Sequence, residues 1–328
     1  MRIGIIGAGR ISKVHARAVA AHPEAELVLV ADPVLSAAQA LVAQYGGRAT
    51  DGPDQVLTGA DIDAVIICSP TTLHAQQVLT AVRAGKPVLC EKPVAATVAE
   101  ARELEQALAG MDARVMVGFN RRFDPSFAAA KAAALAGKLG EVEQVTITSR
   151  DPAAPSKEYI ATSGGIFKDM SIHDLDMAQF LIGEIAQLSA VGMNMDPDLV
   201  ETGDFDGAVV TLVSKTGKVA TVINSRHCAT GYDQRLEIFG QAGSAVVDNL
   251  RPTALSLNTA EYSGAQDPYL DFFLDRYVEA YALELAAFIE AVQAGSPLSP
   301  SLHDGVVALE LAAAAEQAAR TNSTVFLS

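Results

Sequence analysis

The sequence predicts an α/β protein of two domains, in which a doubly wound parallel sheet precedes an α+β domain with a mostly antiparallel, open sheet. Three observations lead to this prediction. The chain has 328 residues, which is enough for two domains. Apolar strands alternate with helical segments up to about residue 120, and strands of alternating apolar and polar residues follow. We therefore expect domains at residues 1–121 and 122–328.

The N-terminal segment has the pattern of a strand, a glycine turn and a helix. An apolar run, RIGII, precedes GAGRIS, and KVHARAVAAH then has apolar residues at helical spacing. Gly7 permits the tight turn, Gly9 lets the backbone approach a pyrophosphate, and the helix N-terminus offers N–H groups to the anion. Ser12 stands where a third glycine is usual. This unit predicts a Rossmann-type site for a dinucleotide, with Arg10 and Ile11 as further contacts.

An aspartate ends the second predicted strand. Residues 27–31 lead to Asp32, roughly 20 residues after the glycine turn, where such units carry an acid for the ribose. The carboxylate would bind both ribose hydroxyls and repel a 2′-phosphate, and Pro33 and Val34 follow it in place of an arginine. We expect NAD in preference to NADP. The alternative is a strand-end aspartate that caps the helix beginning at Leu35.

Polar residues also follow the later parallel strands. Ligands of such sheets bind outside the carboxyl ends of the strands, so these residues should surround one site. The candidate cofactor contacts there are Ser69, Pro70, Thr71, His74, Glu91, Lys92 and Asn120. A half-exposed position in a helix is an equal alternative for His74.

Lys92 is a candidate for chemistry, because a lysine at the mouth of a buried strand between Glu91 and Pro93 is poorly placed for solubility alone. A cation beside the cofactor can lower the pKa of a substrate hydroxyl and stabilise the alkoxide as hydride leaves. We also predict a cis Lys92–Pro93 peptide bond, which would re-aim the lysine.

Five ionisable residues gather in the segment GGIFKDMSIHDLDMAQFLIG, which reads as a helix of about four turns ended by a glycine. At about 100° per residue, Asp169, His173 and Asp176 lie on one face. The other two, Lys168 and Asp174, point elsewhere. Only three of the charges therefore converge.

Three roles are possible for this face. A metal site needs a third or fourth ligand, which no further His or Cys cluster supplies. A solvated face would not align the aspartate and the histidine with Phe180. Proton transfer is the remaining role, in which His173 accepts the hydroxyl proton. Asp169 would hold Lys92 or the substrate, and Asp176 would orient the histidine.

The second part of the chain predicts a sheet with one packed and one wet face, covered by helices on one side. The predicted helices are 127–136, 271–294 and 302–321, and the strands are 141–150, 208–213, 218–224, 235–240 and 244–248. The open sheet face could serve oligomerisation.

Composition excludes several classes of protein. The formal net charge is −15 and no Lys/Arg cluster is interleaved with aromatics, which argues against nucleic-acid binding. No apolar run approaches the ~20 residues of a membrane span and no cleavage site follows the first strand, so we expect a cytoplasmic protein. The three cysteines have no paired spacing, which predicts buried thiols without disulfide or zinc.

With the glycine turn, the CEKP run and the DxxxH helix, the chain resembles the Gfo/Idh/MocA oxidoreductase family over essentially its full length. The resemblance implies that Lys92, Asp169 and His173 form the catalytic group. Within the family, stretches such as VGFNRRFDPSF and NSRHCATGYDQRLEIFG look like the bacterial inositol 2-dehydrogenases. That implies NAD-dependent oxidation of myo-inositol to a 2-keto inosose, the first step of inositol catabolism, in a homotetramer built through the C-terminal sheets.

The same resemblance implies a substrate pocket. Its candidates are Lys92, Asn120, Arg121, Asp151, Asp169, His173 and Tyr232. A polyol needs such donors and acceptors, because a buried unpaired polar group costs about 1–3 kcal/mol. Tyr232 could also be a packed strand-end tyrosine. Arg121 and Arg122 could only pair with acids, and of the two we favour Arg121 in the site. His227 stands where an arginine is expected, which bears on the isomer that fits.

Two other functions remain open on the sequence. One is a dehydrogenase of another inositol isomer, such as scyllo- or D-chiro-inositol, or of a pyranose sugar. The other is a non-catalytic NAD-binding sensor, which would not need the complete set of Lys92, Asp169 and His173.

Overall fold

The structure is a computed structural model that describes residues 1–327, and it divides into two compact units. The first unit comprises Met1–Asp124 and Val278–Glu310. The second comprises Pro125–Tyr277 and residues 311–327. The units differ from the predicted domains in one segment, because residues 278–310 pack with the first unit and not with the chain that precedes them.

The first unit is built on a six-stranded parallel sheet. Its strands are β1 (Arg2–Ile6), β2 (Glu26–Ala31), β3 (Arg48–Thr50), β4 (Ala64–Ile67), β5 (Val88–Glu91) and β6 (Val115–Gly118), in the order β3-β2-β1-β4-β5-β6. This confirms the predicted doubly wound parallel sheet. The sequence did not predict β3, which has only three residues. Strand order reverses beside β1, so the topological switch point lies at the carboxyl end of that strand.

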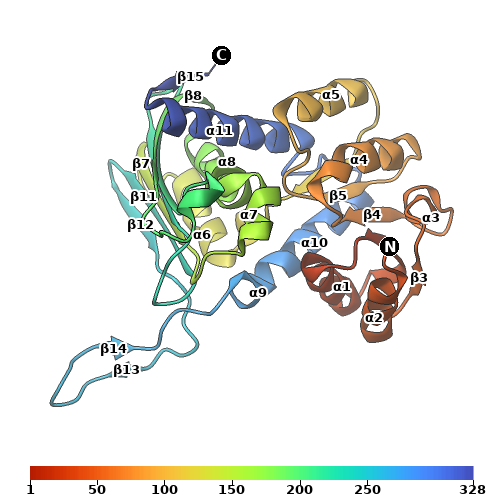
Figure 1. The fold of residues 1–328 in the computed structure, drawn as a ribbon, viewed down its shortest axis with the longest axis horizontal. Coiled ribbons are helices and arrows are strands. Elements are labelled where there is room, and N and C mark those ends of the chain that lie inside the picture. Colours follow the sequence, from red (N-terminus) through yellow and green to blue (C-terminus); the bar gives the residue numbers. More distant parts are fainter. Residues whose placement is uncertain (328) are drawn as a thin grey trace. The chain divides into compact units, whose positions relative to one another are not determined.

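Helices cover both faces of this sheet (Figure 1). They are α1 (Arg10–Ala21), α2 (Leu35–Tyr45), α3 (Asp54–Thr58), α4 (His74–Arg83), α5 (Val98–Leu108) and α10 (Val278–Ala294). The helix α10 joins this unit because its apolar side packs into the core of the sheet: Leu285, Phe288 and Ile289 are buried against the cluster that contains Ile3 and Val19. Sequence order alone could not reveal this return of the chain.

A buried acid on α10 makes stability depend on pH. Glu284 is 0% exposed, and burial, with a smaller effect of Glu91, raises the pKa of its carboxyl well above the usual 4.5. The folded state therefore keeps a proton that the unfolded chain releases above about pH 4.3. Consequently the contribution of Glu284 to stability falls as pH rises from there toward the folded pKa.

We expect Glu284→Gln to remove this loss. The free energy of unfolding of the variant should gain on that of the wild type as pH rises above about 4.3, by up to about 1.4 kcal/mol per pH unit, until the folded-state pKa is passed. Thermal unfolding at several pH values measures the difference. The matched control is Glu290→Gln on the exposed side of the same helix, which should follow the wild type. Parallel pH curves for Glu284→Gln and the wild type would contradict the raised pKa.

The second unit is built on a seven-stranded mixed sheet. Its strands are β7 (Val142–Arg150), β8 (Ile185–Met193), β9 (Gly207–Ser214), β10 (Val219–Ser225), β11 (Asp233–Gly240), β12 (Gly243–Val247) and β15 (Val325–Phe326), in the order β12-β11-β7-β10-β9-β8-β15. Only β7 and β10 pair in parallel among these neighbours. The predicted, mostly antiparallel sheet is therefore confirmed, whereas β8 and β15 were not predicted.

Most helices of the second unit were predicted from the sequence, but the helix at Lys157–Ser163 was not. The helices of this unit are α6 (Pro125–Leu135), α7 (Lys157–Ser163), α8 (Ile172–Ile182) and α9 (Phe273–Arg276), while α11 (Leu302–Thr321) has the predicted bounds and contributes to both units. The predicted helix 271–294 breaks at Tyr277 into α9 and α10. A short hairpin of β13 (Ser256–Leu257) and β14 (Ala265–Gln266) extends from this unit (Figure 1).

The segment before α8 differs from the predicted regular helix. Phe167–Ser171 forms a π-helical turn, and α8 then runs to Gly183, whose φ of 87° ends it as predicted. A π turn contains more residues than an α turn, so the 100° spacing does not apply around Asp169. Such turns are frequent at functional sites.

Two general expectations can be compared with the described residues. Within residues 1–327, no helix combines the length and apolarity needed to cross a membrane. All three cysteines are free thiols, but only Cys90 is buried, and Cys68 and Cys228 are partly exposed. The expectation of buried thiols was therefore wrong for two of them, because both lie in segments that follow strands and not within them.

Candidate active site

The predicted cofactor residues of the first unit lie at one edge of its sheet. Adjacent parallel strands end there, each followed within two residues by a candidate: Gly7, Asp32, Ser69, Lys92 and Asn120 follow β1, β2, β4, β5 and β6. Parallel strands place their carboxyl ends on the same edge, which is where doubly wound sheets bind ligands. The sheet thus brings together residues that are far apart in the sequence.

The glycine turn has the geometry that a pyrophosphate requires. Gly7 has a φ of 97°, and a Cβ there would lie 2.7 Å from the carbonyl oxygen of Cys68. At Gly9 a Cβ would meet no atom within 4 Å, so its open side leaves room for a ligand. Gly9 is also the N-cap of α1 and makes no side-chain cap bond, so the first N–H groups of α1 remain available to an anion. These residues fit a dinucleotide.

Asp32 connects the glycine turn to the end of β2. Its Oδ2 accepts a hydrogen bond from the Ala8 N–H at 2.7 Å, and its Oδ1 accepts one from the Val34 N–H at 2.8 Å. The N-cap of α2 is Val34, so the alternative role of Asp32 as the cap residue is not what the structure shows. Each carboxylate oxygen has a further lone pair with which to bind a ribose hydroxyl.

Asn120 and Arg121 begin a 3-10 turn after β6, and both are buried. The Nδ2 of Asn120 has no hydrogen-bond partner among residues 1–327, so this buried donor is available to a ligand. The neighbouring Arg122 lies 3.0 Å from Asp304. Burial raises the pKa of Asp304, but Arg122 and the hydrogen bonds from Ser301 outweigh it and lower the pKa overall. As predicted, Arg122 pairs with an acid.

Lys92 follows β5 directly, and its peptide bond to Pro93 is cis, as predicted. The backbone N–H of Lys92 lies 3.3 Å from Oε2 of Glu91. Glu91 itself is buried, and its Oε1 lies 2.7 Å from Nε2 of His15 on α1. The Glu91 side chain is therefore directed into the core, and its contact with the cofactor stays a prediction.

His74 also differs from its prediction. The ring is 1% exposed, with Nδ1 2.7 Å from the carbonyl oxygen of Pro93 and Nε2 2.8 Å from that of Ser69. The half-exposed position is therefore wrong, because the ring is buried with both nitrogens facing backbone carbonyl oxygens, and the cofactor contact stays a prediction. Burial lowers the pKa of His74, against the effect of these carbonyl oxygens.

In the second unit, Asp169 is held by residues that the sequence did not indicate. Tyr159 on α7 donates its hydroxyl to Oδ1 of Asp169 at 2.9 Å. Nη1 of Arg226, which follows β10, lies 4.0 Å from Oδ2. Arg226 is only 1% exposed, and its Nη2 also donates to Asp204 at 3.0 Å. A buried arginine thus connects the end of β10 to the π turn.

The other ionisable residues of this segment differ in how deeply their side chains are buried. His173 is half-buried in the first turn of α8, whereas Asp176 is buried. Asp174, which was predicted to point away from the candidate face, is completely buried and accepts a hydrogen bond from Nδ2 of Asn224 at 2.8 Å. Ser171 donates to Oδ1 of the same asparagine at 2.6 Å. Asp174 therefore fixes α8 to β10.

Two substrate candidates lie near the ends of β7 and β10. Asp151 follows β7, and its N–H donates to the carbonyl oxygen of Ser225 at 2.9 Å. Since these strands are parallel, Asp151 and Arg226 follow the same edge of the sheet. Tyr232 is buried and packs edge-on against Phe272 and Tyr277, which favours the packed-tyrosine alternative.

His227 was noted because an arginine was expected at its position. Its Nε2 lies 3.5 Å from Oδ2 of Asp196, and the side chain is substantially exposed. The arginine of this region is the preceding residue, Arg226, whose side chain is buried. Its position directly after a strand of alternating burial is the signal that could have indicated it.

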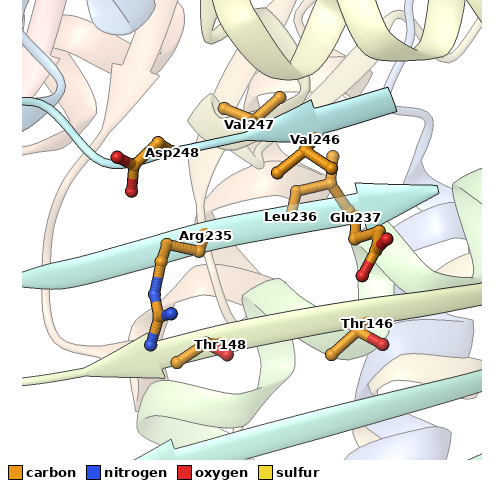
Figure 2. A pocket seen from close by; sticks show the side chains of 8 residues that line it. All are labelled: Thr146, Thr148, Arg235, Leu236, Glu237, Val246, Val247 and Asp248. Carbon is orange, nitrogen blue, oxygen red and sulfur yellow. The ribbon is translucent and has the colours of Figure 1, made fainter. Parts of the chain in front are cut away.

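The hollow in Figure 2 contains none of the predicted site residues. Thr146 and Thr148 of β7 and Arg235 and Glu237 of β11 line it, together with residues of β12. The side chains of Thr146, Thr148, Arg235 and Glu237 project from the open face of the sheet, whereas α8 packs on β7, β9 and β10 from the other face. The hollow is therefore a feature of the open sheet face and not of the candidate active site.

Comparison with known proteins identifies the family. Residues 1–119 match the model of an oxidoreductase family with an NAD-binding Rossmann fold, and residues 127–246 match the GFO/IDH/MocA C-terminal domain. The chain belongs to the Gfo/Idh/MocA family. It is accordingly an NAD-dependent oxidoreductase, as predicted.

Three similar proteins illustrate how much of this Gfo/Idh/MocA chain is matched. An inositol 2-dehydrogenase of Rhizobium meliloti (strain 1021) is 45% identical over 317 residues, which cover 96% of each chain. The crystal structure of a myo-inositol dehydrogenase from Corynebacterium glutamicum ATCC 13032 is 46% identical, with a TM-score of 0.97 over 100% of this chain and 99% of that one. A scyllo-inositol dehydrogenase from Lactobacillus casei, with bound NAD(H) and scyllo-inositol, is 30% identical, with a TM-score of 0.92 over 99% and 98%.

Proposed function

We propose that this enzyme oxidises myo-inositol to 2-keto-myo-inositol (scyllo-inosose) with NAD as the hydride acceptor, the first step of inositol catabolism. The observation that carries the proposal is the similarity to a myo-inositol dehydrogenase over the whole of both chains, at 46% identity and a TM-score of 0.97. Fold similarity alone would not specify a substrate. The matched region covers this chain completely and therefore includes the segments that contain the candidate site residues.

The first unit binds the cofactor in this proposal. The glycine turn and the N-terminus of α1 hold the pyrophosphate, with Arg10 and Ile11 beside it, and Asp32 binds the ribose. Ser69, Pro70, Thr71 and Asn120 face the nicotinamide half. Bound NAD would supply the hydride acceptor for the carbon that carries the reacting hydroxyl. Lys92, at the end of β5, donates a hydrogen bond to that hydroxyl and favours its alkoxide.

The second unit contributes the proton acceptor. His173 takes the hydroxyl proton, because an imidazole with an ordinary pKa near ~6.5 can accept a proton at neutral pH. Asp169, held by Tyr159 and Arg226, binds the substrate. Arg121 and Asp151 bind further hydroxyls, since each hydroxyl needs a partner on burial.

Initial rates with NAD and a panel of polyols test the substrate. We expect myo-inositol to be oxidised faster than scyllo-inositol, D-chiro-inositol and glucose. A preference for scyllo-inositol would favour the alternative that the similarity to the L. casei enzyme raises. No turnover of any inositol above the glucose rate would exclude the proposal, and NAD binding without turnover of any polyol would favour a sensor.

The choice of cofactor should depend on Asp32. We expect Asp32→Asn to lower the ratio of kcat/KM for NAD to kcat/KM for NADP by at least about tenfold, because the charge that repels a 2′-phosphate is lost. Initial rates with both cofactors measure this ratio. Glu26→Gln, at the opposite and exposed end of β2, removes one charge as well and should leave the ratio unchanged. An equal ratio in both variants would contradict the role of Asp32.

We also propose that the enzyme is cytoplasmic. The open sheet face supports its assembly as a homotetramer. Cross-strand rows of β-branched residues lie on this face: Val191, Val209 and Ile223 form one row, which continues to Thr148. A second row contains Thr211, Thr221 and Thr146. Such a flat, uncharged centre suits stacking of two sheets. Light scattering of the wild type and of Val209→Lys would measure the assembly, and an unchanged mass for the variant would contradict this interface.

A further inference from the structure

Two buried histidines from different helices bind the two residues that flank Lys92. His15 on α1 places Nε2 at 2.7 Å from Oε1 of Glu91. His74, the first residue of α4, places Nδ1 at 2.7 Å from the carbonyl oxygen of Pro93. Glu91 and Pro93 are the direct sequence neighbours of Lys92. The lysine is thus held from both sides by side chains that do not belong to its own strand.

The contact of His15 connects Lys92 to the glycine turn. His15 is 0% exposed, its Nδ1 has no partner within the described residues, and its ring packs edge-on against Tyr281 at 5.6 Å between centroids. Its polar attachment is therefore the Glu91 carboxylate, whose other oxygen receives the N–H of Lys92 at 3.3 Å. Since α1 begins directly after Gly9, a shift of this helix reaches Lys92 through one side-chain pair.

The contacts of His74 connect two strand ends. Its Nδ1 binds the segment after β5, and its Nε2 binds the carbonyl oxygen of Ser69, in the segment after β4, at 2.8 Å. A neutral imidazole has one N–H and donates to only one of two acceptors. The tautomer with its proton on Nδ1 donates to Pro93 and so acts directly on the neighbour of Lys92, whereas the tautomer with its proton on Nε2 donates to Ser69.

We propose that His15 and His74 are positioning residues for Lys92, and that His15 also couples the pyrophosphate turn to this lysine. The inference rests on the proposed catalytic role of Lys92. Displacing a reacting group by about 1 Å can cost about 100-fold in rate. Two fixed neighbours on either side restrict such a displacement of the lysine backbone.

Amide side chains separate the two ring nitrogens. The amide nitrogen of Asn lies near the position of Nδ1 of histidine, and that of Gln lies near Nε2. His74→Asn therefore keeps the bond to Pro93 and loses the bond to Ser69, whereas His74→Gln does the reverse. At position 15 the order is inverted, because His15→Gln keeps the bond to Glu91 and His15→Asn loses it.

We expect the Asn and Gln substitutions to have opposite effects on kcat at positions 74 and 15. His74→Asn and His15→Gln should keep kcat within about threefold of the wild type, and His74→Gln and His15→Asn should lose about tenfold to a hundredfold. NADH affinity, measured by fluorescence titration, should change less than kcat. If the histidines served stability alone, the Asn and Gln variants at each position would lose kcat equally. Equal losses at a position would therefore overturn the proposal, as would a larger loss in His74→Asn than in His74→Gln or in His15→Gln than in His15→Asn.

A second measurement does not depend on the substrate. Labelling of Lys92 by an amine-reactive reagent, relative to the exposed Lys13 of the same chain, should change several-fold in the two variants that lose their bond and stay near wild type in the other two. If no polyol is oxidised, the function proposal fails while this result still tests the positioning. Glu91→Gln provides the same labelling test if substitutions at both histidines prevent folding, and wild-type labelling in it would overturn the proposal for His15.

Discussion

Replacing Lys92 by alanine should abolish most turnover and leave cofactor binding almost intact. We expect kcat to fall by about 10²–10⁴-fold, the usual contribution of a group that assists proton transfer. The dissociation constant for NADH should stay within a few-fold, because the residues that fit the pyrophosphate and the ribose belong to the glycine turn, α1 and the end of β2. Initial-rate assays with saturating myo-inositol measure kcat, and fluorescence titration with NADH measures the dissociation constant.

The control for Lys92→Ala is Lys86→Ala in the same unit. Lys86 precedes β5, and its ammonium donates to the carbonyl oxygens of Gly59 at 2.8 Å and Ile62 at 2.6 Å. It is therefore structural and lies at the amino end of the strand whose carboxyl end carries Lys92. We expect a loss of stability in that variant without a comparable loss of kcat. Wild-type turnover in Lys92→Ala would contradict the catalytic assignment.

Replacing Arg226 by methionine should cause the largest loss of stability in the second unit. Arg226 is almost completely buried, and its guanidinium lies between Asp204 at 3.0 Å and Asp169 at 4.0 Å. Removing one partner of a buried pair leaves the other charge uncompensated, which costs about 3–5 kcal/mol. Oδ1 of Asp204 also accepts the Ile166 N–H at 3.0 Å, so the start of the π turn loses its attachment to β10.

Thermal unfolding and kcat together test this role of Arg226. We expect the unfolding midpoint to fall by roughly 6–20 °C, which follows from about 2–4 °C per kcal/mol for a unit of this size. In any fraction that stays folded, kcat should fall because Asp169 loses its cationic partner. Arg48→Met is the matched control, since Arg48 pairs with Asp61 at the exposed surface and should affect neither quantity strongly. Similar shifts in both variants would show that burial of Arg226 has no special effect.

The sequence predicted most of the first unit because its signals are local. A parallel strand buried on both faces needs a continuous apolar run, and a turn that approaches phosphate needs glycine, so RIGII followed by GAG identifies both. Gly7 illustrates why: any Cβ there would collide with the Cys68 carbonyl. The same locality let the sequence predict α11 with its observed bounds and the cis Lys92–Pro93 bond.

Predictions failed where partners come from distant parts of the chain. The sequence did not indicate that the side chains of His74 and Glu91, both predicted as cofactor contacts, lie against Pro93, Ser69 and His15. No periodicity could show this, because burial is set by elements from other parts of the sequence. The assignment of 278–310 to the second domain had the same cause, since α10 returns to the first sheet.

The candidate catalytic group illustrates what the sequence determined and what only the tertiary structure decided. The residue types and spacing of the DxxxH helix and the CEKP run were sufficient to select Lys92, Asp169 and His173 and to predict the family. Which atoms hold these residues was decided by tertiary structure: a π turn moves Asp169 off the regular helical spacing, and the buried Arg226 binds it from β10. Sequence determines local conformation through sterics and backbone hydrogen bonding, whereas packing of distant elements determines which polar groups are buried and with what partners.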